Sequence, residues 1–273
     1  MQKDVHFYLT YALARKAGLT GEYAEKIAWA DQFTDEMSEA VVHGIQTQSS
    51  DIAGNWGDKQ IQATVLVPFH FIPGKDEKYP WKTLPNNFRA RRLVRSASKN
   101  GNLFQFGIAL HGLQDTFSHQ GFSGWHEKLN SCFPWYYLKS TLPNIGHAEM
   151  RVIPDVTHYS WTDPRNSQKI HNWKRAISAA RETYEFLRKV FDNGSPSAHW
   201  PSIEARLKDL FRLDSYDTRI TEICKLSGNT EIDFAEVDER LRPEYEDDFI
   251  FAAKSHLAIA MSLFSDIPQI KDA

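Results

Sequence analysis

A ladder of ionisable side chains lies within one apolar segment of this chain. His111, Asp115 and His119 follow one another at four-residue steps, with Phe104 and Ile108 before them on the same stripe. Four residues advance an α-helix by one turn plus about 40°, so the three polar side chains share one face. Burying them is unfavourable unless they bind something, and zinc prefers such ligands. The alternative is a buried His–Asp pair with one surface histidine.

Helical periodicity dominates the remaining sequence and predicts an all-α fold. Helices are expected at about 4–17, 20–35, from 88 onward, 102–119, 167–193, 203–211, 216–226 and after Pro243. Two long stretches, 37–86 and 120–165, read as irregular, and loops of that length are usually functional or ligand-bound. With no visible boundary, residues 1–273 are expected to form one all-α metallohydrolase-like domain.

Composition narrows the class of protein. Two cysteines exclude a disulfide framework and a thiolate zinc site. The formal charge of −3 is spread along the chain and predicts no strong nucleic-acid patch. We interpret the basic run from Arg89 to Lys99 as the solvated face of a short helix. The sequence has no apolar run long enough to cross a membrane and no signal-peptide pattern at its start, so we expect a cytoplasmic protein.

Further potential metal ligands occur far from the ladder. His6 lies on the apolar face of the first helix, His70 closes an apolar segment, and His147 follows a glycine. Asp31 and Asp35 share the inward stripe of the second helix. For His6 alone, a satisfied core histidine is the favoured interpretation, and His70 and His147 alone are also explained as ordinary residues. In an all-α bundle, however, such groups converge on one pocket, and the whole set favours metal binding.

Several short motifs together resemble the zinc-dependent phospholipase C and single-strand-specific nuclease superfamily, and most closely an uncharacterised bacterial family of that kind. The motifs are Lys3-Asp4-Val5-His6, Gln32-Phe33-Thr34-Asp35, Phe69-His70-Phe71-Ile72-Pro73-Gly74, Asp115 through His119 to Gly124, Gly146-His147 and Pro154-Asp155. They cover roughly residues 1–190. The resemblance implies a helical domain of that type, with long irregular loops around a cluster of three zinc ions.

The resemblance also implies ligands for each ion. These are His70, His111 and Asp115 for the first, His119 and His147 for the second, and His6 with a bridging Asp115 for the third. Asp35 would take the place of the carboxylate that orients or deprotonates the attacking water, and it counts among the candidate ligands as well.

The chain departs from the superfamily at several points. The superfamily binds its third ion through the amine and carbonyl of an N-terminal tryptophan, whereas this chain starts at Met1. Asp4 is the candidate substitute, and a weak or empty third site is the alternative. Arg151 stands where the superfamily has a glutamate, and we expect Asp155 to replace that ligand. The second choices are Glu149 and His158. The spacing from Asp115 to the next histidine is shorter here, and the relatives are secreted.

The expected function is therefore a zinc-dependent hydrolase that cleaves a phosphoester with a metal-activated water, with Asp35 and Asp115 as catalytic residues. Two or three Zn²⁺ ions are expected, with iron and manganese as alternatives. A small-molecule or lipid phosphoester is the expected substrate, and the aromatic loop 122–137 is either its wall or plain packing. The alternatives are a non-catalytic, metal-stabilised binding module and an iron enzyme of different chemistry. The oligomeric state stays open.

Overall fold

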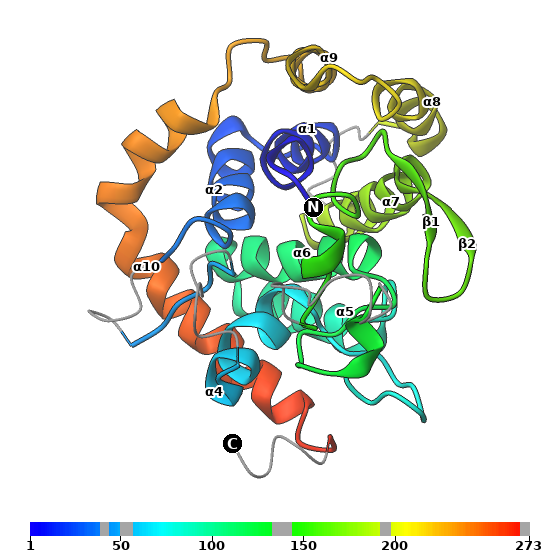
Figure 1. The fold of residues 1–273 in the computed structure, drawn as a ribbon. Helices are drawn as coiled ribbons and strands as arrows, with labels where there is room; N and C mark the ends of the chain where they lie inside the picture. The colour runs from blue at the N-terminus through cyan, green and yellow to red at the C-terminus, as the bar shows by residue number, and fades with distance from the viewer. Residues whose placement is uncertain (39–43, 50–56, 133–143, 192–197, 268–273) are drawn as a thin grey trace.

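The computed structural model describes residues 1–38, 44–49, 57–132, 144–191 and 198–267, and these are mostly helical (Figure 1). The helical class expected from the sequence is confirmed at this level. The elements are η1 (Asp4–Leu9), α1 (Thr10–Lys16), α2 (Gly21–Phe33), α4 (Lys59–Ile61), η2 (Gln62–His70), α5 (Phe88–Asn100), α6 (Leu103–Ser118), η3 (Lys128–Asn130), η4 (Ala148–Met150), β1 (Ser160–Asp163), β2 (Gln168–His171), α7 (Asn172–Val190), α8 (Trp200–Leu210), α9 (Tyr216–Ser227) and α10 (Phe234–Leu263).

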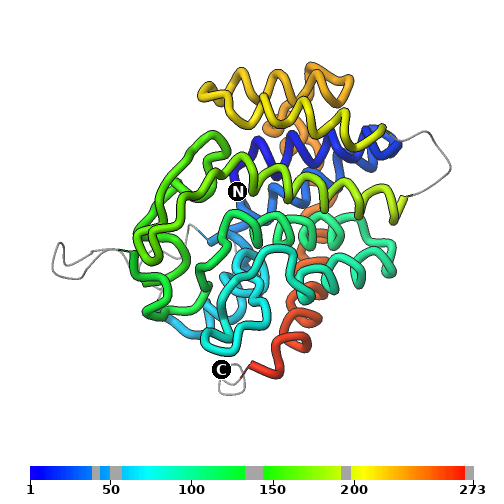
Figure 2. The backbone as a smooth tube through the Cα atoms, turned by 90° about the vertical axis from the view of Figure 1, so that its right-hand side faces the viewer, coloured from blue at the N-terminus to red at the C-terminus, as the bar shows by residue number. Residues whose placement is uncertain are grey.

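Helix α6 lies at the centre of the molecule, with α2, α5, α7 and α10 packed around it (Figures 1 and 2). Asn102 caps its start by accepting a hydrogen bond from the backbone of Gln105 at 2.9 Å. Every α6 residue from Phe104 to Ser118 is buried. A helix surrounded by protein is normally apolar all round, so the buried polar side chains of α6 call for partners.

Two glycines let neighbouring elements approach α6 closely. A Cβ atom on Gly107 would lie 2.4 Å from the Ile27 carbonyl oxygen of α2. A Cβ atom on Gly112 would lie 2.6 Å from Cδ1 of Ile72, just beyond η2. Both contacts are closer than van der Waals packing allows. The glycines therefore bring α2 and η2, with the polar residues near their ends, against the buried face of α6.

The structure corrects several boundaries expected from the sequence. The stretch 37–86 is not wholly irregular, because residues 59–70 form α4 and η2, with Pro68 inside η2. The expected helix start near Ser167 is wrong: β1 and β2 form an antiparallel hairpin that pairs Ser160 with His171, and α7 begins only at Asn172. Four-residue strands give too short a pattern for periodicity to detect.

The last helix also begins earlier than Pro243. Asp233 caps α10 by accepting hydrogen bonds from the backbone of Ala235 and Glu236, and the helix continues through the proline. A proline removes one backbone donor and kinks a helix, but neighbouring packing holds this one. None of the helices in the described ranges is long and apolar enough to cross a membrane.

Candidate metal centre

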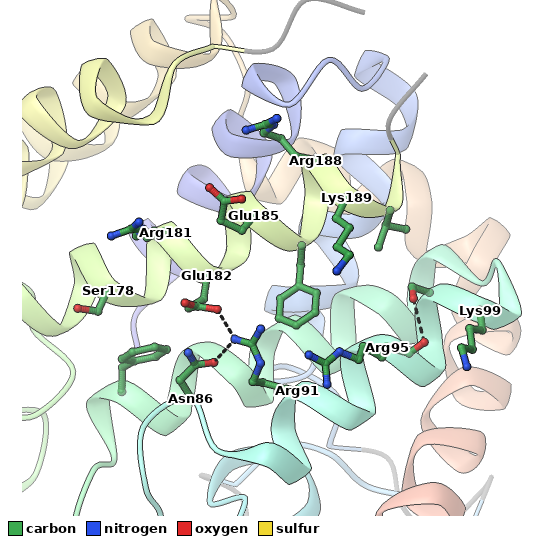
Figure 3. Close-up of a pocket in the computed structure, with 14 residues that line it drawn as sticks. Asn86, Arg91, Arg95, Lys99, Ser178, Arg181, Glu182, Glu185, Arg188 and Lys189 are labelled. Carbon is green, nitrogen blue, oxygen red and sulfur yellow. Dashed lines mark hydrogen bonds and ion pairs between the residues drawn. The ribbon is translucent and has the colours of Figure 1, made fainter. Parts of the chain in front are cut away.

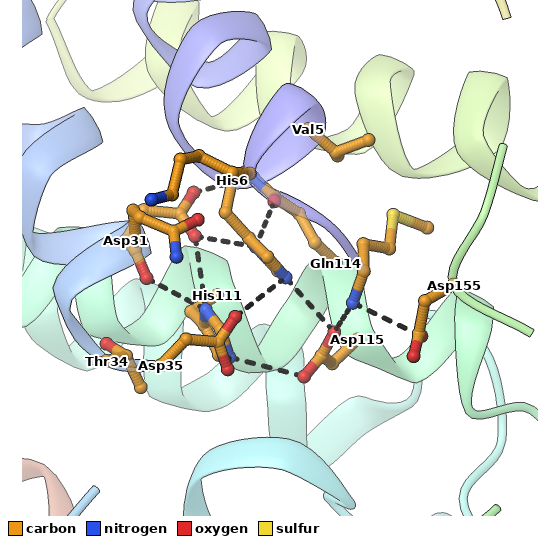
Figure 4. Close-up of polar contacts among 12 residues, drawn as sticks. Val5, His6, Asp31, Thr34, Asp35, His111, Gln114, Asp115 and Asp155 are labelled. Carbon is orange, nitrogen blue, oxygen red and sulfur yellow. Dashed lines mark hydrogen bonds and ion pairs between the residues drawn. The ribbon is translucent and has the colours of Figure 1, made fainter. Parts of the chain in front are cut away.

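Eight of the nine candidate ligands predicted from the sequence come together at the C-terminal half of α6. Helix α6 contributes His111 and Asp115, and His119 follows at its end. The others are delivered by η1 (His6), the turn after α2 (Asp35), the end of η2 (His70) and the loop around η4 (His147, Asp155). Figure 4 shows the part of this cluster around His6, His111 and Asp115.

The first group consists of two imidazole nitrogens that lie close to each other and to two carboxylate oxygens. Nε2 of His111 lies 3.1 Å from Nδ1 of His70, 3.2 Å from Oδ2 of Asp115 and 3.6 Å from Oδ1 of Asp35. Nδ1 of His70 lies 3.3 Å from Oδ2 of Asp115 and 3.7 Å from Oδ1 of Asp35. Zinc–ligand bonds of about 2.0–2.1 Å at tetrahedral angles separate ligands by about 3.3–3.5 Å. The distances that join the two imidazoles to each other and to the two carboxylates therefore suit zinc ligands.

The second group is formed by two histidines and one aspartate. Nε2 of His119 lies 3.2 Å from Oδ1 of Asp155, and Nε2 of His147 lies 3.3 Å from Oδ2 of the same carboxylate. Each imidazole donates from Nδ1 to a backbone carbonyl, that of His70 at 2.8 Å and that of Arg151 at 2.7 Å. Those bonds leave the Nε2 lone pairs free to face a cation, an arrangement common behind metal-bound histidines.

Arg151 adopts an unusual backbone conformation beside this second group. Its φ is +51° and its ψ is −132°, a region that residues other than glycine rarely occupy. The carbonyl that results accepts the Nδ1 proton of His147. Local backbone strain of this kind is found where a structure fixes functional groups. Arg151 thus orients His147 through its backbone.

A third group lies on the other side of Asp115. Oδ1 of Asp115 forms an ion pair with the amino group of Met1 and lies 3.3 Å from Nε2 of His6. Oδ1 of Asp155 lies 3.5 Å from the same amino group. Burial disfavours the charged amine, but the three nearby carboxylates outweigh it and raise its pKa to about 11. One oxygen of Asp115 therefore faces the first group and the other faces the third.

Two polar atoms of the cluster have no hydrogen-bond partner within the described ranges. They are Nε2 of His6 and Oδ1 of Asp155, and both are buried. A buried polar atom without a hydrogen bond is destabilising, so such atoms usually face a ligand, an ion or water. Both point into the cluster, and the set of donors fits a divalent cation well.

The charge of the cluster also favours a bound cation. Burial lowers the pKa of His111, but Asp35 and Asp115 outweigh burial and raise it to about 10. Burial likewise opposes ionisation of Asp115, yet His119, the Met1 amine and His111 hold its pKa well below its ordinary value. The carboxylates thus favour protonation of the neighbouring Met1 amine and of His111. A metal ion would compete with those protons for the same lone pairs.

Asp31 supports two of the histidines from behind. Its Oδ1 lies 2.9 Å from Nδ1 of His6, and its backbone carbonyl accepts from Nδ1 of His111 at 2.8 Å. Oδ2 of Asp31 accepts hydrogen bonds from Thr10 at 2.7 Å and from Gln114 at 2.9 Å. All five side chains are fully buried. Asp31 therefore holds both imidazoles so that Nε2 of each is directed into the cluster (Figure 4).

Asp4 does not lie at the cluster, which corrects its assignment as a substitute ligand. It forms a fully buried ion pair with Arg219 of α9, with Oδ2 2.6 Å from Nε. Asp4 and His6 are two residues apart on one helical segment and point to roughly opposite sides of it. No local pattern around Asp4 predicts this pairing, because Arg219 comes more than two hundred residues later in the chain.

The two second-choice ligands also have other partners. Glu149 accepts a hydrogen bond from the backbone of Cys132 at 2.7 Å, and Nδ1 of His158 lies 3.4 Å from Nη1 of Arg219. Asp155 is thus the acid that the loop brings to His119 and His147. Of the aromatic loop 122–137, only residues up to 132 lie within the described ranges, and there Phe122 is buried.

The comparisons give the chain a family. A search among curated proteins and a search among solved structures each returned no match. A family model described as a family of unknown function, DUF6765, matches residues 1–265. That span includes every residue of the cluster and all of the helices and strands given above. The chain belongs to this family of unknown function, DUF6765.

Proposed function

We propose that this protein is a zinc-dependent hydrolase of phosphoesters with a multinuclear metal centre. The observation that carries the proposal is the set of four atoms from Asp35, His70, His111 and Asp115, separated by 3.1–3.7 Å wherever a distance to a histidine is measured. His119, His147 and Asp155 would hold a second ion. His6, with Asp115 as a bridge, would hold a third, as the resemblance of the sequence implies.

The centre is open on one side, as a catalytic site needs to be. The side chains of Asp35, His147 and Asp155 are 29%, 18% and 15% exposed, whereas those of His6, His70, His111 and Asp115 are at most 2% exposed. Structural metal sites are closed by protein ligands, and catalytic ones keep a position accessible to water and substrate. This difference favours an enzyme over a module that uses metal only for stability.

Bound zinc ions would supply Lewis acidity, which lowers the pKa of a water to about 7 and neutralises phosphoryl oxygens. The residues of the chain would do the remaining work. Asp35, the most exposed carboxylate of the cluster, would accept a proton from the attacking water or align it. Asp115, with one oxygen toward the first group and the other toward the third, would hold those two groups at a fixed separation. Backbone carbonyls and Asp31 would hold the imidazoles in one tautomer, so that the donor atoms do not need to reorganise.

The decisive experiment combines metal content with turnover. Elemental analysis of the purified protein should give two or three zinc ions per chain, and bis-p-nitrophenyl phosphate should be hydrolysed in a chelator-sensitive way. Asp35→Ala should retain the fold and lose turnover, whereas His199→Ala, an exposed histidine outside the cluster, should retain both. Bound zinc without turnover would favour the non-catalytic module, and bound iron would favour a different chemistry.

A further inference from the structure

A large groove lies between α5 and α7, and it has a volume of about 1050 Å³ (Figure 3). Phe117 and Phe186, both buried, line it together with basic side chains from the two helices. The basic residues number six, against two acidic ones, Glu182 and Glu185. The six are Arg91, Arg95, Lys99, Arg181, Arg188 and Lys189. A chain with a formal charge of −3 thus concentrates positive charge in one concave surface.

Most of this positive charge is not neutralised by the protein. Arg91 forms an ion pair across the groove with Glu182 and donates to Oδ1 of Asn86 at 2.9 Å. Within the described ranges, the other five cations form no ion pair with a carboxylate. Exposed cations crowded together repel one another, and binding an anion relieves that repulsion. The groove is therefore suited to a ligand with several negative charges.

The groove is separate from the metal centre. Asp115 and Phe117 are two residues apart on α6, which places them roughly 200° apart around the helix. Asp115 faces the metal-ligand cluster, and Phe117 faces the groove. None of the six groove cations contacts a candidate metal ligand. A ligand in the groove would consequently bind on the other side of α6, and the inference below does not depend on the proposed hydrolase activity.

The arrangement of the cations fits a linear anion. Arg91, Arg95 and Lys99 follow one another at four-residue steps on α5, so their Cα atoms are spaced about 6 Å apart over about 12 Å. The row on α7 from Arg181 to Lys189 has the same length. The described lining contains no exposed aromatic ring on which a base could stack. The groove is therefore built to contact a charged backbone and carries no feature that would select bases.

We propose that this groove binds the phosphate backbone of single-stranded nucleic acid without regard to base sequence. Arginine matches phosphate oxygens with its planar fork, and a flexible single strand can follow the length of the groove. A DNA duplex is a stiff rod and cannot follow the groove in this way. A flat lipid surface would likewise miss Arg91, which is partly buried inside the groove by its pairing with Glu182.

The test measures binding of a labelled oligothymidylate by fluorescence anisotropy over a range of salt concentrations, using the full protein as purified. The variant Arg95→Ala/Lys99→Ala removes two exposed cations of the groove. We expect its affinity to fall about tenfold and the slope of log K against log salt to decrease in magnitude by about 1.4. The matched control is Arg92→Ala/Arg206→Ala, in which two exposed cations outside the groove are removed. It should leave both the affinity and the slope nearly unchanged.

Several results would overturn the proposal. These are an unchanged affinity in the groove variant, an equal loss in the control variant, and stronger competition by a duplex than by a single strand. Sedimentation with anionic vesicles that depends on Arg95 and Lys99 would assign the groove to a lipid surface instead. Turnover of bis-p-nitrophenyl phosphate should be the same in the groove variant and the parent protein. Failure of binding and failure of hydrolysis are thus observed separately.

Discussion

The carboxylate of Asp31 lies 2.9 Å from Nδ1 of His6, and both side chains are completely buried. This contact fixes which nitrogen of His6 carries the proton and leaves Nε2, which has no hydrogen-bond partner among the described residues, directed toward Asp115. A carboxylate behind a histidine is a common way to orient a metal ligand and to raise its basicity. Asp31 is therefore a positioning residue whose effect should appear in metal affinity.

Replacing Asp31 with asparagine should weaken zinc binding by about 10–100-fold, because the amide oxygen is needed by the donors Thr10 and Gln114, and the NH2 group left facing Nδ1 of His6 cannot accept its proton. A competition titration against a chromophoric chelator measures this change. The control is Asp209→Asn, an exposed acid of α8 far from the cluster. Equal zinc affinities for the Asp31 variant and the parent protein would show that the contact has no positioning role.

Asp115 should influence more than one ion, because its two oxygens face different groups. Oδ2 faces His70 and His111, whereas Oδ1 faces His6 and the Met1 amine. We expect Asp115→Ala to lower the metal content by more than one ion per chain. His147→Ala should lower it by one at most, since His147 belongs to the second group alone. Elemental analysis of the two variants, prepared in parallel, decides between these outcomes, and equal losses would contradict the bridging arrangement.

The buried pair of Asp4 and Arg219 should matter for stability through the fold and not through metal binding. Removing one partner leaves an uncompensated buried charge, which typically destabilises a protein by about 3–5 kcal/mol. We expect Arg219→Met to lower the free energy of unfolding by that amount, as measured by urea denaturation. The double variant Asp4→Asn/Arg219→Met should be more stable than the single one. A double variant that is less stable than Arg219→Met alone would argue against this account.

Gly112 should resist substitution for a reason that a second mutation can relieve. An alanine there would place Cβ 2.6 Å from Cδ1 of Ile72, which lies in the segment that follows His70. We expect Gly112→Ala to lower the free energy of unfolding by about 1–3 kcal/mol and to reduce zinc content. Because Ile72→Val removes Cδ1, it should partly restore both quantities in the double variant. The absence of any rescue would mean that the backbone oxygen of Phe69, 3.1 Å away, sets the limit.

His256 predicts how stability depends on pH. Burial of this α10 side chain lowers its pKa from 6.5 to about 4, in part opposed by its hydrogen bond to the carbonyl of Pro68. Between these pH values the unfolded chain binds a proton that the folded chain excludes. The corresponding stability is complete above pH 6.5 and is lost as the pH falls toward 4, by about 3 kcal/mol.

The measurement compares the parent protein with His256→Gln, whose amide can still donate to Pro68. Both are unfolded by urea at several pH values in the presence of a chelator, so that loss of metal does not contribute. The parent should lose more stability than the variant between pH 6.5 and pH 4. Parallel curves would contradict a buried, neutral His256.

Much of the helical framework and of the cluster could be predicted from local sequence. The spacing of His111, Asp115 and His119 predicted their shared face because helical geometry is regular. The caps at Thr20 and Asn102 lie where the expected helices begin. That His6, His70 and His147 approach that face was expected from the tendency of such residues to gather, and the structure brings all three near Asp115 or Asp155.

The remainder depended on contacts that no local pattern contains. Asp4 was misassigned because its partner, Arg219, lies on a helix distant in sequence. Asp31 was predicted only to be an inward carboxylate, because its partners come from three different elements. The groove was missed for the same reason. The basic run on α5 alone reads as a solvated surface, and only the packing of α7 beside it turns two exposed rows into a cationic groove.

The shared carboxylate of Asp115 has one more consequence. An ion bound to one oxygen of Asp115 would withdraw electron density from the other oxygen and hold the carboxylate in one orientation. The ions would therefore not bind independently of one another. A zinc titration of the stripped protein should then show interaction between steps, with the first equivalent changing the affinity for the next. Such a centre would fill in steps, and a partly filled population would persist over a range of zinc concentrations.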